Sequence, residues 1–439
     1  MPYQPGGNLP GEYASKLGHL DVVKSELMDK LIQSFESQTL PKPNTAPKWE
    51  SITTGEPLST IYSVDGSYVP IPFEDWPYVK LGCVKVALVK IDKNELSKFD
   101  TSTPHPMKLR DLLSESVLRH VNLFPLRHVS ITGTNTYHAV RRIVFDGMKN
   151  HEKLGDTVLQ TLKWLAYEKW DTKKPFLPNF GCPHCEKEVA TIPYDCETGN
   201  CPQCSGELYL TDWLGFHQRM APDNAPEEVA IDYMNVYELL LLFTKIRLMW
   251  EDNPENLSKC LFVKDGPLQL TSQFAKLVPR IRKFLEYSRY ARFPVYLVGQ
   301  EKRGRFYEHL ELIGNDAPDG SLFVLYDRYI KEEIQQRPNT GFPYGEFTNY
   351  GAKILVKFNH NDKMVISIPT GEYKRDPKIS DLIGLERILA TLPEILSRRF
   401  QGGLLPVELA HGIASLSNYP SARLIKDFTN TSKISSAGS

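Results

Sequence analysis

The chain has 439 residues, of which 41% are hydrophobic and 24% are charged, a composition typical of a globular protein with two or three domains. Its formal net charge of -1 gives the molecule as a whole no general attraction to nucleic acid. No stretch approaches the roughly 18 apolar residues that a membrane-spanning helix needs, and the first residues have no signal-peptide pattern. We therefore expect a cytoplasmic protein that does not enter a membrane.

Residues 1–50 are predicted to form a helical segment and a linker. Apolar residues recur at helical spacing from 13 to 32, and a Pro-rich stretch covers 41–47. This helix carries no candidate chemistry, and we expect it to pack against the body of the protein or against a second subunit.

Two apolar runs that stop at Asp-Gly, 62–66 and 261–266, form the first candidate site. Each has the pattern of a buried strand that enters a turn, so Asp65 and Asp265 are predicted at the exposed tips of two strands. Asp-Gly is also a common turn dipeptide, and each aspartate alone is compatible with a turn role.

Further strands are predicted at 79–91 and 127–134, followed by a helix at 154–170. The segment 151–228 then has a different character, because it holds two C-x2-C pairs separated by fifteen residues. This spacing is typical of a zinc ribbon in which four thiolates bind one structural Zn²⁺. The predicted ligands are Cys182, Cys185, Cys201 and Cys204. Cys196 and His184 are expected to stay outside the metal site, and Cys83 and Cys260 to lie in the core.

A helix that is apolar on nearly all sides is predicted at 233–250, and it carries one acid, Glu238, in its first half. A carboxylate in such a helix must be paired, neutral or bound to a cation, because an unpaired buried charge is too costly. An ion pair with a nearby Arg or Lys and a metal site are the two alternatives.

The stretch 276–305 holds nine basic residues and two acids, with Phe and Tyr between them. Such a stretch suits a phosphate backbone with bases stacked nearby, although a solvated helix face has the same composition. The predicted DNA-binding residues are Arg280, Arg282, Lys283, Arg289, Arg292, Arg303 and Arg305.

The remaining chain is predicted to alternate strands and helices. Strands are expected at 294–299, 322–326, 353–358 and 364–368, the last two as a hairpin, and helices at 380–399 and 406–416. His411 lies in the last helix, and the tail 426–439 is expected to be disordered.

The candidate acids come together if the first and fourth strands are neighbours in the sheet. Asp65, Glu238 and Asp265 then meet, and His411 could close the site from the last helix. Three carboxylates and one imidazole suit Mn²⁺ or Mg²⁺.

In order and local context, these motifs resemble those of the NurA nuclease family, from residue 60 to about 420. The resemblance rests on Asp65-Gly66-Ser67, Glu238, Asp265-Gly266-Pro267, Val298-Gly299 with Lys302, and Leu405 to His411. It implies a ribonuclease H-like α/β fold, a mixed sheet flanked by helices, in two parts at 51–150 and 229–425. The zinc-ribbon module at 151–228, with its ribbon at 182–204, interrupts that domain.

The resemblance also implies that Asp65, Glu238, Asp265 and His411 are Mn²⁺ or Mg²⁺ ligands. For Lys302 two alternatives stay open, a contact to the scissile phosphate and a surface lysine without a catalytic role. NurA proteins are DNA nucleases, typically 5′-to-3′ exonucleases that also cut single strands, and they act as dimers with a hexameric HerA-type ATPase. DNA end processing and phage defence are both compatible with such a pair. The ribbon module is not part of the minimal family domain, and Leu404-Leu405-Pro406 replaces a typical Tyr-Pro.

Three alternatives stay open at the level of sequence. Asp212, just after the ribbon, also has the context of an acid that follows a strand. A non-catalytic DNA-binding or adaptor subunit would use the ribbon and the basic stretch without hydrolysis. A metal-dependent phosphatase for small substrates would need a narrow pocket in place of an open basic groove.

Overall fold

The computed structural model describes residues 43–72, 80–96, 117–126, 133–149, 157–220, 227–397 and 403–416, with a few isolated positions besides. The chain divides into two compact units, residues 1–44 and residues 45–439, and nearly all described residues belong to the second. The predicted N-terminal helix and the predicted tail lie outside the described residues. No helix in the described part of the chain is long and apolar enough to cross a membrane.

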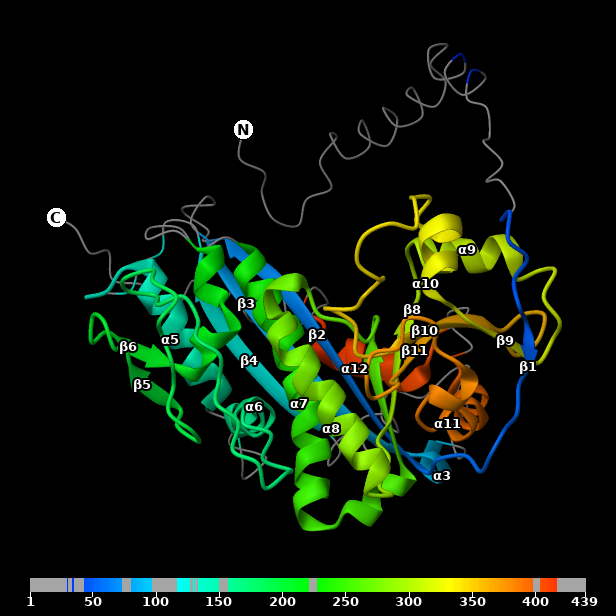
Figure 1. The fold of residues 1–439 in the computed structure, drawn as a ribbon, viewed down its shortest axis with the longest axis horizontal. Helices are drawn as coiled ribbons and strands as arrows, with labels where there is room; N and C mark the ends of the chain where they lie inside the picture. Colours follow the sequence, from blue (N-terminus) through cyan, green and yellow to red (C-terminus); the bar gives the residue numbers. More distant parts are fainter. Residues whose placement is uncertain are drawn as a thin grey trace, which may run out of the picture. The chain divides into compact units, whose positions relative to one another are not determined.

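A nine-stranded mixed sheet forms the centre of the second unit (Figure 1). Its spatial order is β1-β9-β10-β11-β8-β7-β2-β3-β4. The strands are β1 (Glu50–Ser51), β2 (Thr60–Pro72), β3 (Lys80–Asp92), β4 (Val117–Pro125), β7 (Cys260–Asp265), β8 (Tyr296–Glu301), β9 (Ser321–Val324), β10 (Ala352–Lys357) and β11 (Lys363–Ile368).

Five of these strands have the topology of a ribonuclease H-like sheet. The first three, β2, β3 and β4, pair as an antiparallel meander, and β7 joins β2 on its other side in parallel, followed by β8, also parallel. The first and fourth of them, β2 and β7, are therefore neighbours. This confirms the predicted fold class, a mixed sheet flanked by helices.

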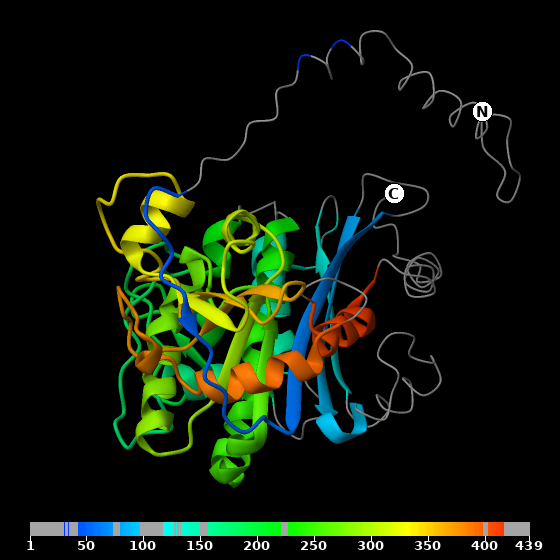
Figure 2. The ribbon, with the colours of Figure 1, turned by 90° about the vertical axis from the view of Figure 1, so that its right-hand side faces the viewer.

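Helices cover both faces of the sheet. One face carries α5 (Thr136–Lys149), α6 (Val158–Ala166), α7 (Glu227–Asp252), α8 (Val278–Tyr290) and, at its far end, α9 (Arg305–Ile313). The other face carries α11 (Leu385–Thr391) and α12 (Leu405–Ala414). Figure 2 shows α7 (green) and α12 (red) on opposite sides of β2 (blue).

Alternate residues of β2 enter the two cores. Tyr62 and Val64 pack in the core beneath α7, whereas Ile61 packs in the core beneath α12. This follows from the two-residue period of a strand, and it places Asp65 on the α12 face. The centre of α7 is buried on all sides, as its sequence predicts, because helices and strands surround it.

Several predicted elements have different bounds in the structure. Half of the predicted strand at 127–134 lies outside the described residues, and within the described half Ile131 and Thr134 form only an isolated bridge; the third strand is β4 instead. The predicted helix 380–399 was wrong in extent, because α11 ends at Thr391 and a 3-10 turn with Pro393 follows it. The β10-β11 hairpin is confirmed, with Lys357 opposite Lys363.

Candidate active site

The two aspartates lie where β2 and β7 separate. The parallel pairing of these strands ends at Val64 and Lys264, and the next residue on each strand is the candidate acid. Asp265 ends β7 as predicted. The prediction for Asp65 was wrong: it lies within β2, which stays paired with β3 through Gly66 as far as Pro72. The fork between the strands therefore replaces the predicted turn.

Asp65 is joined to the C-terminal helix. The Nδ1 of His411, on α12, donates a hydrogen bond to Oδ2 of Asp65 at 2.7 Å. The Asp65 side chain is only 10% exposed, and the His411 side chain is 65% exposed. With its proton on Nδ1, the imidazole keeps the lone pair of Nε2 free for a metal ion or a proton. The structure thus brings together residues from opposite ends of the domain.

Asp265 is paired with the lysine that follows β8. The Nζ of Lys302 lies 3.2 Å from each carboxylate oxygen of Asp265. The strand before this lysine runs close to the turn after Asp265, since a Cβ on Gly299 would lie 2.6 Å from the carbonyl oxygen of Gly266. The absence of a side chain at Gly299 therefore allows Lys302 and Asp265 to meet.

Glu238 approaches β2 from the α7 face, opposite to Asp65. A Cβ on Gly66 would lie 2.4 Å from Oε1 of Glu238, so the carboxylate occupies the space that a side chain at residue 66 would fill. Glu238 is 4% exposed, and its Oε2 lies 4.0 Å from Nζ of Lys264. The sequence analysis does not identify Lys264 as a partner of Glu238. The available signal was a lysine next to Asp265 in a strand that is predicted to be buried.

The carboxylates are coupled electrostatically. Burial raises the pKa of Glu238 to about 8, with Lys264 acting against the shift and Asp65 and Asp265 adding to it. Burial also raises the pKa of Asp65, and the Asp265 charge adds to this shift while His411 opposes it. Buried carboxylates that repel one another are stabilised by a bound cation.

The residues present fit a divalent metal ion in their chemistry. Three carboxylates and one imidazole are the ligand types that Mn²⁺ and Mg²⁺ accept, and the space over Gly66 receives one of the carboxylates. The ligand atoms are not gathered into a tight group, however. In the described part of the chain, the only set of three or more His, Cys, Asp or Glu ligand atoms within 4.8 Å of one another is the cysteine set.

That set contains the four cysteines of the predicted ribbon, Cys182, Cys185, Cys201 and Cys204. The Sγ atoms of Cys182 and Cys204 lie 3.8 Å apart, and those of Cys185 and Cys201 lie 3.9 Å apart. Four sulfurs at about 2.3 Å from a tetrahedral Zn²⁺ would lie about 3.8 Å from one another. The cluster therefore has the dimensions that a zinc site requires and could hold this metal.

The two halves of this site repeat one backbone turn. In the first, the Cys182 N–H bonds to the Lys187 carbonyl and the Glu186 N–H bonds to the Cys182 carbonyl, both at 2.9 Å. Cys201 and Ser205 form the equivalent bonds in the second turn, also at 2.9 Å. The hairpin of β5 (Thr198–Asn200) and β6 (Glu207–Tyr209) completes the ribbon.

The other predictions about cysteine and histidine agree with the structure. Cys196 is exposed and outside the cluster, whereas Cys83 and Cys260 are buried in the core. Nε2 of His184 donates to the carbonyl of Glu207 at 2.8 Å, and its ring stacks on His138.

Asp212 has a structural role. It forms a two-pronged ion pair with Arg141 on α5, at 2.9 Å and 2.7 Å, and both side chains are 3% exposed. Its Oδ2 also accepts the Tyr209 N–H at 2.8 Å. Because its carboxylate oxygens are occupied in this way, Asp212 joins the ribbon to the body of the protein and is not an alternative to Glu238.

The basic stretch divides into structural and exposed residues. Arg280 and Lys283 both form ion pairs with Glu168, and Arg282 donates to main-chain carbonyls. The exposed members of the predicted DNA-binding set that lie outside these contacts are Arg289, Arg292, Arg303 and Arg305. The interleaved aromatic residues divide in the same way: Phe284 is completely buried and Tyr296 is 7% exposed, whereas Tyr287 is 39% exposed and Tyr290 is 78% exposed. Of these four rings, only Tyr287 and Tyr290 are exposed enough for the predicted stacking on bases.

Comparisons with known proteins do not assign a role to any of these residues. No protein-family description matches the sequence, and no curated protein matches it. Among solved structures, the crystal structure of the NurA nuclease from Sulfolobus solfataricus is similar over 96% of this chain and 96% of its own, with 12% identity and a TM-score of 0.33. A TM-score this low does not establish a common fold, and the function is inferred from the site itself.

Proposed function

We propose that the protein is a metal-dependent deoxyribonuclease that uses Mn²⁺ or Mg²⁺ to hydrolyse phosphodiester bonds. The observation that carries the proposal is the meeting of Asp65 and Asp265 at the β2-β7 fork, with His411 bonded to one and Lys302 to the other. In open α/β sheets the carboxyl edge of the parallel strands is the usual place for a ligand.

The side chains of the site have separate roles in this proposal. Asp65, Asp265, Glu238 and the Nε2 of His411 would hold the metal. Bound divalent ions activate a water molecule and stabilise the leaving oxygen in phosphodiester cleavage. Asp65 holds the imidazole of His411 in one tautomer through their 2.7 Å hydrogen bond. Lys302 places an ammonium group beside Asp265, where it would contact a phosphate oxygen.

A polynucleotide fits this edge better than a small phosphate ester. Lys302 is one-third exposed, and two exposed arginines follow it, Arg303 on the same loop and Arg305 at the start of α9. Arginines beside the acids suit a continuous phosphate backbone. The pocket lined by Arg282, Asp327 and Tyr373 contains none of the four proposed ligands, so it is not the metal-containing pocket that a small-substrate phosphatase would need.

The resemblance in sequence adds partners to the proposal. A NurA-like protein would act as a homodimer with a HerA-type hexameric ATPase, as a 5′-to-3′ exonuclease and single-strand endonuclease, in DNA end processing or phage defence. This chain has no glycine-rich phosphate loop of the Walker type, so ATP-driven movement would come from the partner. A pull-down with a HerA-type ATPase, and the mass of the purified protein in solution, test these two associations.

Hydrolysis of linear DNA by the purified protein tests the central proposal. We expect degradation with Mn²⁺ or Mg²⁺, none without a divalent ion, and none with Asp65→Ala at an unchanged thermal unfolding midpoint. Intact DNA with every metal, together with retained DNA binding, would instead identify a non-catalytic adaptor subunit.

A further inference from the structure

Two phenylalanines are exposed on the segment 335–349, which we call the aromatic loop and which precedes β10. Phe342 is 75% exposed and Phe347 is 57% exposed. Their ring centroids lie 5.2 Å apart at an interplanar angle of 74°, so the rings form one continuous apolar surface. Large apolar side chains gathered in this way on a surface usually mark a binding site.

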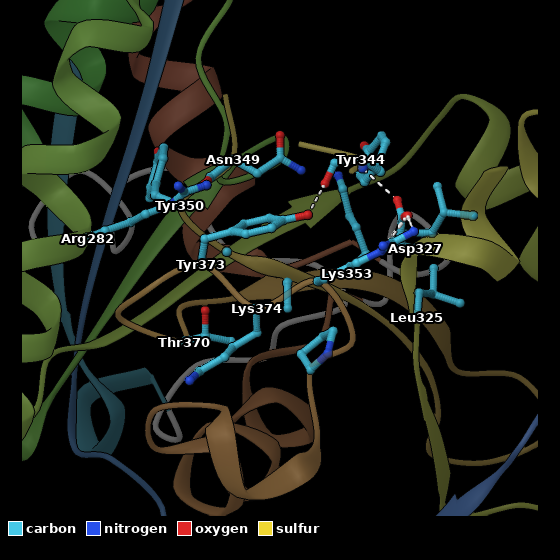
Figure 3. Close-up of a pocket in the computed structure, with 15 residues that line it drawn as sticks. Arg282, Leu325, Asp327, Tyr344, Asn349, Tyr350, Lys353, Thr370, Tyr373 and Lys374 are labelled. Carbon is cyan, nitrogen blue, oxygen red and sulfur yellow. Dashed lines mark hydrogen bonds and ion pairs between the residues drawn. The ribbon is translucent and has the colours of Figure 1, made fainter. Parts of the chain in front are cut away.

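The aromatic loop is held in place by a half-buried arginine. Arg282, on α8, donates to the carbonyls of Glu346 at 2.8 Å and Gly345 at 3.2 Å, and also to the carbonyl of Asn349. Burial lowers the pKa of Arg282 to about 10, and its guanidinium lies over the Tyr373 ring at 4.9 Å. Figure 3 shows this arginine beside Asn349, Tyr350 and Tyr373.

A second set of bonds fixes the middle of the aromatic loop at Tyr344. Its backbone N–H donates to Asp327 at 2.6 Å, and its carbonyl accepts the Tyr373 hydroxyl at 3.0 Å (Figure 3). Asp327 is in turn paired with Lys331 and Arg375. The exposure of the two phenylalanines is therefore not the result of a loosely held loop.

The end of the aromatic loop lies against the segment that follows Asp265. The Leu270 N–H bonds to the Thr348 carbonyl, and the Tyr350 N–H bonds to the Leu268 carbonyl, both at 2.9 Å. Leu268 is only three residues beyond Asp265 in the sequence. The aromatic loop is therefore anchored next to one of the proposed metal ligands.

The aromatic loop also contacts the basic segment that contains Lys302. The rings of Tyr344 and Phe306 lie 5.6 Å apart, and Phe306 directly follows the exposed Arg305. Lys302, at the start of the same segment, is bonded to Asp265. Aromatic rings, exposed arginines and the proposed metal ligand thus lie on adjoining segments of one edge of the sheet.

We infer that Phe342 and Phe347 stack on unpaired bases of a single-stranded nucleic acid whose phosphates lie along Arg303 and Arg305. The inference rests on the proposed nuclease function and specifies its substrate. An aromatic platform beside cations is the arrangement that binds single strands without regard to sequence, because every base has a face to stack and every nucleotide has a phosphate. Paired bases within a duplex do not offer these faces.

Fluorescence anisotropy with a labelled single-stranded oligonucleotide, without added divalent ion, tests the inference. We expect the double variant Phe342→Ala/Phe347→Ala to bind about 5- to 100-fold more weakly, as removal of base stacking predicts. Its dependence on salt concentration should be unchanged. Arg303→Gln, in contrast, should lower the salt slope by about 0.7, because one phosphate would no longer be neutralised by a cation. Phe176→Ala, at a phenylalanine that is 84% exposed elsewhere in the chain, is the matched control.

An oligonucleotide with abasic sites separates base stacking from a general structural effect. The wild-type protein should bind the abasic strand more weakly, and the double phenylalanine variant should bind the normal and abasic strands alike. Equal binding of the normal strand by wild type and double variant would overturn the inference. So would a double variant that keeps its DNA affinity but changes its mass in solution, since the rings would then form a protein contact.

The failure of this inference is distinguishable from the failure of the proposed function. If the protein hydrolyses no DNA but its DNA binding depends on both phenylalanines, the proposed nuclease function is wrong and the inferred base-stacking surface stands. If the protein hydrolyses DNA and the double phenylalanine variant binds DNA as the wild type does, the nuclease function stands and the base-stacking inference is wrong.

Discussion

The imidazole of His411 donates a 2.7 Å hydrogen bond to Asp65, although 346 residues separate the two in the sequence. This bond joins the first strand of the ribonuclease H-like sheet to the last described helix. It orients the exposed imidazole with its Nε2 free, next to the fork at which Asp265 ends β7. The candidate metal centre therefore depends on elements from both ends of the domain.

Substitution of Gly66 by alanine should displace Glu238. The new Cβ would lie 2.4 Å from the carboxylate oxygen and 2.6 Å from a Met234 carbon, and both neighbours are flexible side chains. We expect the DNA hydrolysis rate to fall about tenfold or more, while stability changes by roughly 1 kcal/mol or less. Kinetic assays and thermal unfolding measure the two effects.

Gly55→Ala is a suitable control, because its new Cβ would meet no atom closer than 3.3 Å. Full activity in Gly66→Ala would show that the position of Glu238 over Gly66 has no part in the reaction.

The four ribbon cysteines should bind one zinc ion per chain. Cys182→Ser should remove the zinc and lower the free energy of unfolding by roughly 3–5 kcal/mol, since Cys182 and Cys201 are packed in the same core as α7. Elemental analysis and urea unfolding measure these changes. The exposed Cys196 offers the comparison: Cys196→Ser should keep its zinc, and equal zinc loss in both variants would contradict the assignment.

Stability should fall in acid partly through Asp327. The Tyr344 N–H, Lys331 and Arg375 lower the pKa of this carboxyl against the effect of burial. A carboxyl whose pKa is lower in the folded state stabilises the fold above its unfolded value of about 4, and this contribution is lost as pH falls through the folded pKa. Asp327→Asn should therefore cost about 3–5 kcal/mol at pH 7.

Urea unfolding of the wild type and Asp327→Asn between pH 7 and pH 2 measures this contribution. The difference between the two proteins should shrink as the pH falls through the acid range. A difference that does not depend on pH would mean that the carboxyl charge has no role in anchoring the aromatic loop.

Lys302→Met should reduce DNA hydrolysis by about 100-fold, because its ammonium group is proposed to contact the phosphate in the transition state. Lys302→Arg should retain part of the activity. Lys302→Met should leave Mn²⁺ binding intact or strengthen it, since the ammonium group of Lys302 lies 3.2 Å from Asp265 and would compete with a cation for this carboxylate. Weaker metal binding in Lys302→Met would contradict this role.

The sequence predicted the parts of the site that depend on local pattern. Asp265 follows a buried run, Glu238 stands alone in an apolar helix, and four cysteines have ribbon spacing; all three patterns are local. The sequence does not predict that the carboxylate of Glu238 lies over Gly66. This contact is long-range, because it joins β2 to α7, which begins at residue 227. The continuation of β2 beyond Asp65 depends equally on a long-range partner, since β3 holds Gly66 in the sheet.

Burial explains the other differences from the sequence-based predictions. Arg282 and Phe284 belong to a basic, aromatic stretch whose composition suits nucleic acid, but Phe284 is buried and the half-buried Arg282 donates to main-chain carbonyls. Phe342 and Phe347 are in a loop without periodicity, so nothing in the sequence distinguishes them from core residues. Only the tertiary structure shows that these rings are exposed and that the end of their loop is bonded to the segment after Asp265.

Titration of the purified protein with Mn²⁺, followed by calorimetry or by electron paramagnetic resonance, tests the central claim most directly. We predict that the wild type binds Mn²⁺ and that Asp65→Asn and Glu238→Gln each bind at least about 10-fold more weakly. Asp252→Asn, at an exposed aspartate that ends α7, should bind as the wild type does. Unchanged Mn²⁺ affinity in Asp65→Asn would contradict a metal centre at the β2-β7 fork.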